Sequence, residues 1–388
     1  MIIVDKPYIS DLFRQTITKN RFPVVKTGVA RELGFYDKPY FLEEDQAIGL
    51  ARSSKDIRIY TTSENSIGWI ARNLWFTDLP GKIDLFKNKV RFRDLIAPMY
   101  PDFYYREVKF DRLDDLSMED IPVPFIIKPA VGFFSMAVYK VDSIQQWGSV
   151  KESIKQEVKL VKGLYPSEVM NTSSLIIEQC IEGDEFAVDA YYDAAGEPVI
   201  LNIYNHIFSS ASDVSDRVYI SSKEIVQDNI QHFTAFLEEI GNLSGVRNFP
   251  VHVELRSGSG GTILPVEINP MRFGGWCTTA DLTCLSYGIN SYEYYFEQRR
   301  PDWQSVLKDK KDKLYAIIVL DNSTGVSGEE IKAFDYERLL SEFDNPLDLR
   351  KTDYRSYPVF GFLFTETRKE RFSEIESILR SDLRKYII

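Results

Sequence analysis

The stretch VHVELRSGSGGTILPVEINP, residues 251–270, contains two short strand-like segments joined by a glycine-rich connection. Side chains alternate between the faces of a strand, so Glu267 and Asn269 point to the same side. The connection is typical of a flexible hairpin turn. Antiparallel pairing across it sets Glu254 opposite Glu267 and His252 opposite Asn269, and it predicts one oxygen-rich patch.

This patch has the composition of a Mg²⁺ site. Two carboxylates held close together repel each other unless a cation lies between them. Mg²⁺ prefers oxygen ligands and commonly shares them with phosphate oxygens. Glu254, Glu267 and Asn269 are therefore candidate ligands of a Mg²⁺ ion that accompanies a nucleotide. Taken alone, the same alternation is more typical of the solvent-facing side of an antiparallel sheet. Only other segments of the chain can distinguish this alternative from a metal site.

The composition is that of an ordinary soluble globular protein. Its 388 residues suffice for two or three domains. No run approaches the ~18 apolar residues that a membrane helix needs, and residues 1–10 lack the features of a secretory signal. We therefore expect a cytoplasmic protein. Three cysteines without metal-ligand spacing indicate neither a disulfide framework nor a zinc site.

The charge balance argues against large polyanionic partners. Lys and Arg together number 47 and Asp and Glu 58, which gives a net charge of -11. This charge opposes unassisted binding to nucleic acid or to an anionic membrane. We expect small-molecule partners, and the oligomeric state stays open.

The pattern of elements predicts an α+β protein in three parts. Residues 1–85 are expected to form a small α/β domain without a Gly-x-Gly-x-x-Gly loop. Residues 86–300 are expected to form the central domain, with helices covering antiparallel sheets. Residues 301–388 are expected to form a third, small α+β domain, whose role the sequence does not reveal.

The local signals place individual elements. Asn88 is expected to cap a helix. Strands are predicted at 56–61, 125–128, 136–141, 175–181, 185–192, 198–204, 314–320 and 359–365. Helices are predicted at 143–162, from Ser222 to Gly241, at 328–343 and after Arg368.

Two lysines are candidates for phosphate binding. Lys128 ends the apolar strand 125–128, directly before a turn that contains Gly132. A cation at the start of a strand–turn–strand unit can lie over a phosphate while loop amides approach from the other side. A strand-end lysine that reaches solvent is the alternative. Lys89 lies in the first turn of its helix. Taken alone it is the weaker candidate for phosphate binding, because surface lysines are common.

A third segment could bind a nucleoside. Residues 175–181 are followed by the turn Glu182-Gly183-Asp184 and a second strand that begins with Glu185. Backbone groups at such a turn can bind an adenine edge, and a nearby carboxylate can accept ribose hydroxyls. Glu178 and Glu185 fit these roles. A solvent-exposed acidic hairpin is the alternative.

Taken in order, these segments resemble the ATP-grasp superfamily. The resemblance spans about residues 85–300: Asn88-Lys89 before a helix, Lys128 with its Pro-Ala-x-Gly loop, the run IEQCIEGDE at 177–185, and VEINP at 266–270. Each motif is weak alone, but the ordered set is specific. It implies two α+β subdomains that clasp ATP, preceded by a small α/β domain.

The resemblance also implies roles for the candidate residues. Lys89 and Lys128 would contact the phosphates of ATP. Glu178 and the backbone near Cys180 and Ile181 would meet adenine, and Glu185 would meet ribose. The ligands of one or two Mg²⁺ ions would be Glu254, Glu267 and Asn269.

Two positions depart from the family pattern. The loop after Lys128 has Phe133-Phe134 where relatives often have more glycine. Many members also have an arginine directly after Asn-Pro, whereas here Met271 precedes Arg272. We choose Arg272 and Lys128 as the catalytic groups that face the transferred phosphoryl group. His206 and His252 are left unassigned, because a lone histidine on a strand is more often structural.

The reaction that the family implies is the phosphorylation of a carboxylate by ATP, followed by attack of an amine on the acyl phosphate. Cations around the phosphoryl group would supply most of the acceleration without a protein nucleophile. A thiol, bicarbonate or hydroxyl acceptor stays open. So does a nucleotide-binding module that has lost ligation and serves as a regulatory or scaffolding subunit. Trp276 is a candidate for an apolar wall against the substrate.

Overall fold

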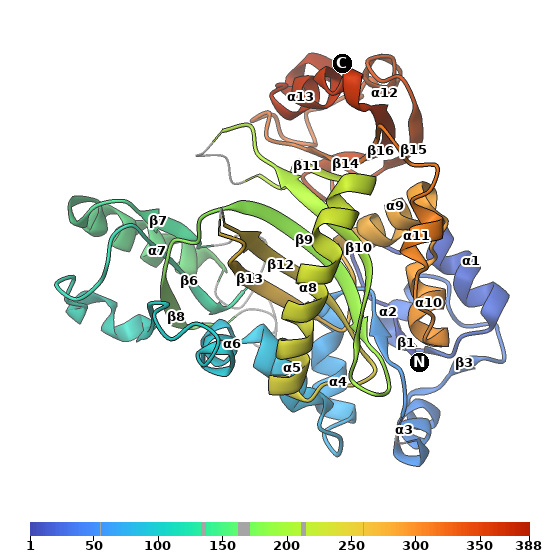
Figure 1. Ribbon diagram of the computed structural model, residues 1–388, viewed down its shortest axis with the longest axis horizontal. Helices are drawn as coiled ribbons and strands as arrows, with labels where there is room; N and C mark the ends of the chain where they lie inside the picture. The colour runs from blue at the N-terminus through green and yellow to red at the C-terminus, as the bar shows by residue number, and fades with distance from the viewer. Residues whose placement is uncertain (55, 133–136, 162–170, 211–214, 259) are drawn as a thin grey trace.

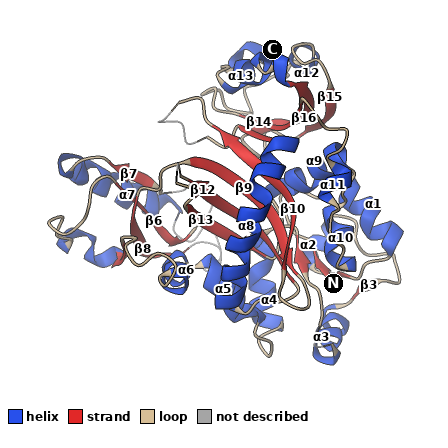
Figure 2. Ribbon diagram, viewed as in Figure 1, coloured by secondary structure: helices blue, strands red, loops and turns tan. Residues whose placement is uncertain are grey.

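The molecule is built on three β-sheets (Figures 1 and 2). It is a computed structural model that describes residues 1–388 except 55, 133–136, 162–170, 211–214 and 259. Helices cover the sheets, and the architecture is α+β, as predicted. The predicted loop residues Phe133 and Phe134, and the predicted element ends at 136 and 162, lie outside the described residues.

The N-terminal sheet is parallel, in the order β3-β2-β1-β4. Its strands are β1 (Ile2–Ile3), β2 (Val24–Val25), β3 (Phe41–Leu42) and β4 (Tyr60–Thr61). Helices alternate with them: α1 (Asp11–Asn20), α2 (Gly28–Glu32), α3 (Glu44–Ser53) and α4 (Ile67–Asn73). The predicted strand at 56–61 is shorter than expected, because its partner β1 offers only two residues for pairing.

The second sheet is antiparallel, in the order β5-β8-β6-β7. Its strands are β5 (Tyr105–Lys109), β6 (Phe125–Val131), β7 (Tyr139–Val141) and β8 (Asn171–Gln179). Helix α7 (Trp147–Val161) shares an apolar cluster with it, which includes Phe125, Ile127 and Ile154. The structure confirms the predicted strands at 125–128 and 175–181, whereas β5 was not predicted.

The central sheet has eight strands, in the order β13-β12-β9-β10-β11-β14-β16-β15. The strands are β9 (Asp184–Tyr192), β10 (Pro198–Ile207), β11 (Val218–Ser222), β12 (Phe249–Ser257), β13 (Ile263–Pro270), β14 (Lys313–Asp321), β15 (Pro346–Lys351) and β16 (Val359–Arg368). The predictions include neither β11 nor β15. Because β14 pairs with β11, the sheet runs from the central region into the last 88 residues, and the division at 85 and 300 stays a prediction.

The long helix α8 (Lys223–Ser244) lies across β9 and β10 (Figure 1). The helix begins near Ser222 as predicted, and the Ser222 side chain caps it by accepting a hydrogen bond from the Ile225 N–H. The predicted end at Gly241 is wrong. Gly245 ends the helix instead, in a left-handed conformation with φ 64°. Gly241 is a packing glycine, since a Cβ there would lie 2.7 Å from Cε1 of Tyr192.

The predicted helix at 328–343 is also wrong. An α-helix covers only α12 (Tyr336–Leu340), capped by Asp335. The backbone before α12 instead pairs with the C-terminal residues, because the Ile388 N–H donates to the Ala333 carbonyl at 2.9 Å. The final helix after Arg368 is confirmed as α13 (Ser373–Leu379).

The remaining helices pack around the central sheet, and none could span a membrane. They are α5 (Leu79–Lys87), α6 (Lys89–Ile96), α9 (Thr278–Tyr287), α10 (Ser291–Glu297) and α11 (Trp303–Val306). Over the part of the chain that the structure describes, no helix combines the length and apolar character of a transmembrane span.

Candidate active site

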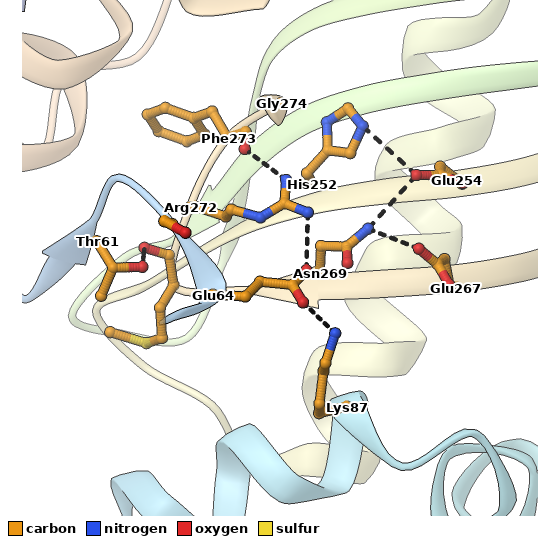
Figure 3. A network of polar contacts seen from close by, with 12 residues as sticks. Thr61, Glu64, Lys87, His252, Glu254, Glu267, Asn269, Arg272, Phe273 and Gly274 are labelled. Carbon is orange, nitrogen blue, oxygen red and sulfur yellow. Dashed lines mark hydrogen bonds and ion pairs between the residues drawn. The ribbon is translucent and has the colours of Figure 1, made fainter. Parts of the chain in front are cut away.

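The hairpin of β12 and β13 has the predicted register. Glu254 lies opposite Glu267 and His252 opposite Asn269. The Asn269 amide joins the two carboxylates: its Nδ2 donates to Oε1 of Glu267 at 3.0 Å and to Oε1 of Glu254 at 3.4 Å (Figure 3). The alternating pattern therefore places these three side chains together.

The two carboxylates differ in charge. Burial, and then the negative charge of Glu267, raise the pKa of Glu254 well above its usual value. Burial also acts to raise the pKa of Glu267, but Lys89 and two further lysines outweigh it and hold that pKa well below its usual value. The pKa values of the two carboxylates are thus shifted in opposite directions, because two buried negative charges at this distance repel each other.

The donor set fits a hard divalent cation. A cation between the carboxylates would offset the repulsion that raises the pKa of Glu254. The third ligand would be Asn269, whose amide presents its oxygen in place of its nitrogen after rotation by a half turn. Among the described residues no group of three His, Cys, Asp or Glu side chains is arranged to hold a metal, so a site at this hairpin depends on that amide.

Lys89 reaches the hairpin from α6. The helix begins as predicted, because the Asn88 side chain accepts hydrogen bonds from the first-turn backbone N–H groups. The Lys89 Nζ lies 3.0 Å from Oε2 of Glu267 and 3.4 Å from the Gly132 carbonyl. Lys87, at the end of α5, donates to the same carbonyl at 3.3 Å. Two ammonium groups therefore approach the loop that follows β6.

Lys128 is paired with Glu178 inside the second sheet. Its Nζ lies 2.5 Å from Oε1 of Glu178, and Arg93 of α6 binds the other oxygen at 2.9 Å. Burial would raise the pKa of Glu178, but Lys128 and Arg93 outweigh it and lower that pKa to about 2. Arg93 also donates to the Pro265 carbonyl of β13 at 2.8 Å, and so it connects the second sheet with the hairpin of β12 and β13.

The residues predicted to meet the nucleoside form a separate group. Glu185 accepts from Arg256 Nε at 2.9 Å and lies 3.0 Å from Nδ1 of His206. Arg256 donates also to the Ile181 carbonyl at 2.6 Å. Cys180, beside it, is half-buried. Their roles toward adenine and ribose stay predictions.

Arg272 points back toward the hairpin from the turn after β13. Met271 adopts a left-handed conformation with φ 68°, and the chain turns there. The Arg272 Nη2 lies 2.8 Å from Oε1 of Glu64, and Nη1 donates to the Phe273 carbonyl at 2.9 Å (Figure 3). Glu64 also contacts Lys87. With Met271 before it, the Arg272 guanidinium is anchored by Glu64, the carboxylate that also pairs with Lys87.

His252 belongs to the same network. Its Nδ1 lies 2.7 Å from Oδ1 of Asp189, a fully buried residue that also accepts from the Gly274 N–H. Its Nε2 lies 3.8 Å from Oε1 of Glu254. Asp189 thus fixes the orientation of the imidazole.

One cavity of about 620 Å³ joins the hairpin to the lysines. Its charged and amide lining includes Glu64, Lys89, Lys128, Glu254, Glu267, Asn269 and Arg272. The predicted nucleoside residues Glu178, Cys180, Ile181 and Glu185 are not part of this lining as far as the described residues show.

A comparison with protein families decides the identity of the central region. The family model of the ATP-grasp domain matches residues 121–280. The chain contains an ATP-grasp domain. The match covers all of β6 to β13, and so it includes Lys128 and the hairpin of Glu254 and Glu267. No curated protein matches the chain in sequence.

Solved structures share the ATP-grasp fold over the full chain. The L-amino acid ligase of Bacillus licheniformis is 18% identical with a TM-score of 0.69, and the match covers 100% of this chain and 98% of that one. The N5-carboxyaminoimidazole ribonucleotide synthetase of Thermotoga maritima is 14% identical with a TM-score of 0.64 and coverage of 100% and 98%. The biotin carboxylase of Campylobacter jejuni, in a complex with an ATP analogue, is 12% identical with a TM-score of 0.62 and coverage of 100% and 91%. Identities this low show the fold alone.

Three charged residues in or near the cavity were not predicted as site residues from the sequence. Arg93 lies four residues after Lys89, hence on the same helix face, and this spacing was a usable signal. Lys87 directly precedes the predicted cap. Glu64 precedes the family match by more than fifty residues, and no local pattern connects it with Arg272.

Proposed function

We propose that the protein is an ATP-dependent ligase, which activates a carboxylate as an acyl phosphate for attack by an amine. One observation carries the proposal: two lysines and an acidic hairpin line the same cavity of an ATP-grasp domain. Ammonium groups attract the phosphates of a nucleotide, while the hairpin offers oxygen ligands to its cation.

Lys89 and Lys128 would hold the phosphates of ATP. Both ammonium groups are now paired with carboxylates, Lys89 with Glu267 and Lys128 with Glu178. A phosphate can replace these partners, because it offers the same charge-assisted hydrogen bonds. Glu178, the backbone at Cys180 and Ile181, and Glu185 would then bind the nucleoside.

The hairpin would hold the metal. Glu254, Glu267 and Asn269 are its proposed ligands, and Mg²⁺ bound there would neutralise charge on the transferred phosphoryl group. Its binding would take the place of the proton that burial and Glu267 favour on Glu254.

The chain itself would position and stabilise the reactants. A substrate carboxylate oxygen bonds to the γ-phosphorus and the bond to ADP breaks. The amine nitrogen then bonds to the acyl carbon, the amine loses a proton, and phosphate leaves. Arg272 faces the same cavity and would stabilise the anionic transition state, because its guanidinium stays charged and is held in place by Glu64.

ADP release in the presence of Mg-ATP tests the proposal. Pools of carboxylates and amines should stimulate ADP release, and mass spectrometry should find an amide product. Replacing the amines by thiols, bicarbonate or alcohols tests the other acceptors. Tight binding of Mg-ATP with no turnover in any pool would instead favour a regulatory or scaffolding module.

A further inference from the structure

The cavity has a second wall that the proposed chemistry does not use. Beyond Arg272 it is lined by apolar side chains from the turn after β13 and from β14 and β16: Trp276, Ile317, Val319, Val359 and Phe362. The last four belong to residues 301–388, whose role the sequence does not reveal.

Strand alternation separates this wall from the core behind it. Val319 pairs with Phe362 and Ile317 with Phe364, so their side chains share one face of the sheet. Their neighbours Ile318 and Leu363 belong to a different apolar cluster, at the C-terminal end of the chain. The sheet therefore presents one apolar face to the C-terminal cluster and the other to the main core cluster, and part of this second face lines the cavity.

The wall exposes apolar surface to the cavity. Trp276, Val319 and Val359 are only half-buried, although all three are apolar. Ligand sites commonly combine such surface with a few polar groups that fix orientation. The polar residue at the end of this face, Asp321, is ion-paired with Arg217 at 2.9 Å.

Trp276 is held firmly in this wall. Its carbonyl accepts a hydrogen bond from Arg350 of β15 at 2.6 Å, and Arg350 also contacts the buried Asp281 of α9. The indole ring packs against Phe362, with ring centroids 5.4 Å apart, and edge-on against Tyr357 at 5.1 Å. A fixed aromatic surface can bind an apolar group at small entropic cost.

Arg272 lines the same cavity as the lysines, the acidic hairpin and the apolar wall. We propose that the carboxylate substrate carries a large apolar substituent, which Trp276, Val319 and Val359 bind while its carboxylate faces Arg272. The inference rests on the proposed ligase function and names the substrate class for the same cavity.

A graded series of acids tests the inference. Acetate, longer aliphatic acids, an aromatic acid and succinate are each offered with Mg-ATP and a fixed pool of amines. A methylene group in an apolar pocket discriminates by roughly 10- to 200-fold, so kcat/KM for ADP release should rise at least about tenfold from acetate to the larger apolar acids. Turnover that prefers acetate or succinate would overturn the apolar subsite and leave the ligase function standing. Absence of ADP release with every acid would overturn both.

Variants of Val319 test the location of the subsite. Val319→Asp should lower the ratio of kcat/KM for a large apolar acid over acetate by at least about tenfold, because it places a charge against the substituent. Val319→Thr keeps the side-chain shape but has a hydroxyl in place of one methyl group, and it should lower the same ratio severalfold. This variant is used if Val319→Asp does not fold. Val123→Asp and Val123→Thr are the controls, since Val123 is 42% exposed and outside the cavity lining. An unchanged ratio in a folded Val319 variant would overturn the assignment.

Discussion

At Glu267, lysines offset the cost of burying a carboxylate. Lys89 forms the direct ion pair, with Lys87 and Lys128 acting from further away. At Glu254, burial and the charge of Glu267 outweigh the opposing effect of Arg272, and the Asn269 amide joins the two carboxylates. The pKa values of two glutamates of one hairpin are therefore shifted in opposite directions, which is the arrangement expected where a cation binds.

Glu267→Gln should abolish metal-dependent turnover. The change removes one of two carboxylates from the proposed site while keeping the side-chain shape, so ADP release at saturating Mg²⁺ should fall by at least about 100-fold, within the range typical when a single catalytic electrostatic group is removed. Circular dichroism should show an intact fold. Glu329→Gln, an exposed change outside the cavity, is the control, and normal turnover in Glu267→Gln would exclude Glu267 from the metal site.

Glu64→Gln should destabilise the protein. Glu64 is buried between Arg272 and Lys87, and breaking a buried ion pair by removing one partner typically costs about 3–5 kcal/mol. The matched control is Glu32→Gln, since Glu32 forms an exposed pair with Lys6, and such pairs contribute about 0–1 kcal/mol. Denaturant titration measures the free energy of unfolding, and equal losses in the two variants would contradict the structural role of Glu64.

At the scale of elements, Glu178 of β8 ties three segments together. It pairs with Lys128 of β6 and with Arg93 of α6, and Arg93 also binds the backbone of β13. The sequence predicts both strands and the helix start, because each depends on local alternation or on a capping residue. It does not predict that these three charges meet, since the contact depends on how separate elements pack.

The stabilising effect of Glu178 should depend on pH. Its folded pKa is about 2, below the value of 4.5 for a free glutamate. The stabilisation is thus complete above pH 4.5 and is lost as the pH falls toward 2, and a shift of this size corresponds to about 3 kcal/mol. Denaturant titrations at pH 6 and pH 3 should show that the stability gap between wild type and Glu178→Gln narrows at the lower pH. A constant gap would contradict the depressed pKa.

Gly241→Ala tests why a glycine lies inside α8. Alanine usually favours a helix over glycine by about 1 kcal/mol, but here the new Cβ would meet the Tyr192 ring at 2.7 Å. We expect a net loss of about 1–3 kcal/mol in the free energy of unfolding. Gly49→Ala in α3, where nothing lies within 4 Å of the new Cβ, should be neutral or stabilising. A stable Gly241→Ala variant would mean that the glycine does not serve close packing.

At the scale of the whole molecule, the cavity draws on all three regions of the chain. Glu64 comes from the N-terminal region, the lysines and the acidic hairpin from the centre, and Val319 and Phe362 from the last strands. The central motifs were recognisable because their order resembles a known superfamily. The outer walls were not, because Glu64 and Val319 carry no local signal and acquire their place only through the packing of the three sheets.

Binding of Mg-ATP should stabilise the whole molecule and should depend on the acidic hairpin. A ligand that binds only the folded state at about 100 times its Kd contributes about 2.7 kcal/mol, which should raise the Tm by a few degrees. Thermal melts with ATP, with and without Mg²⁺, measure the effect. In Glu267→Gln the increment due to Mg²⁺ should disappear, because the ion then loses a protein ligand, while Glu329→Gln should keep it. An equal increment in both variants would place the metal elsewhere, whereas the absence of any shift with Mg-ATP in the wild type would contradict nucleotide binding in this cavity.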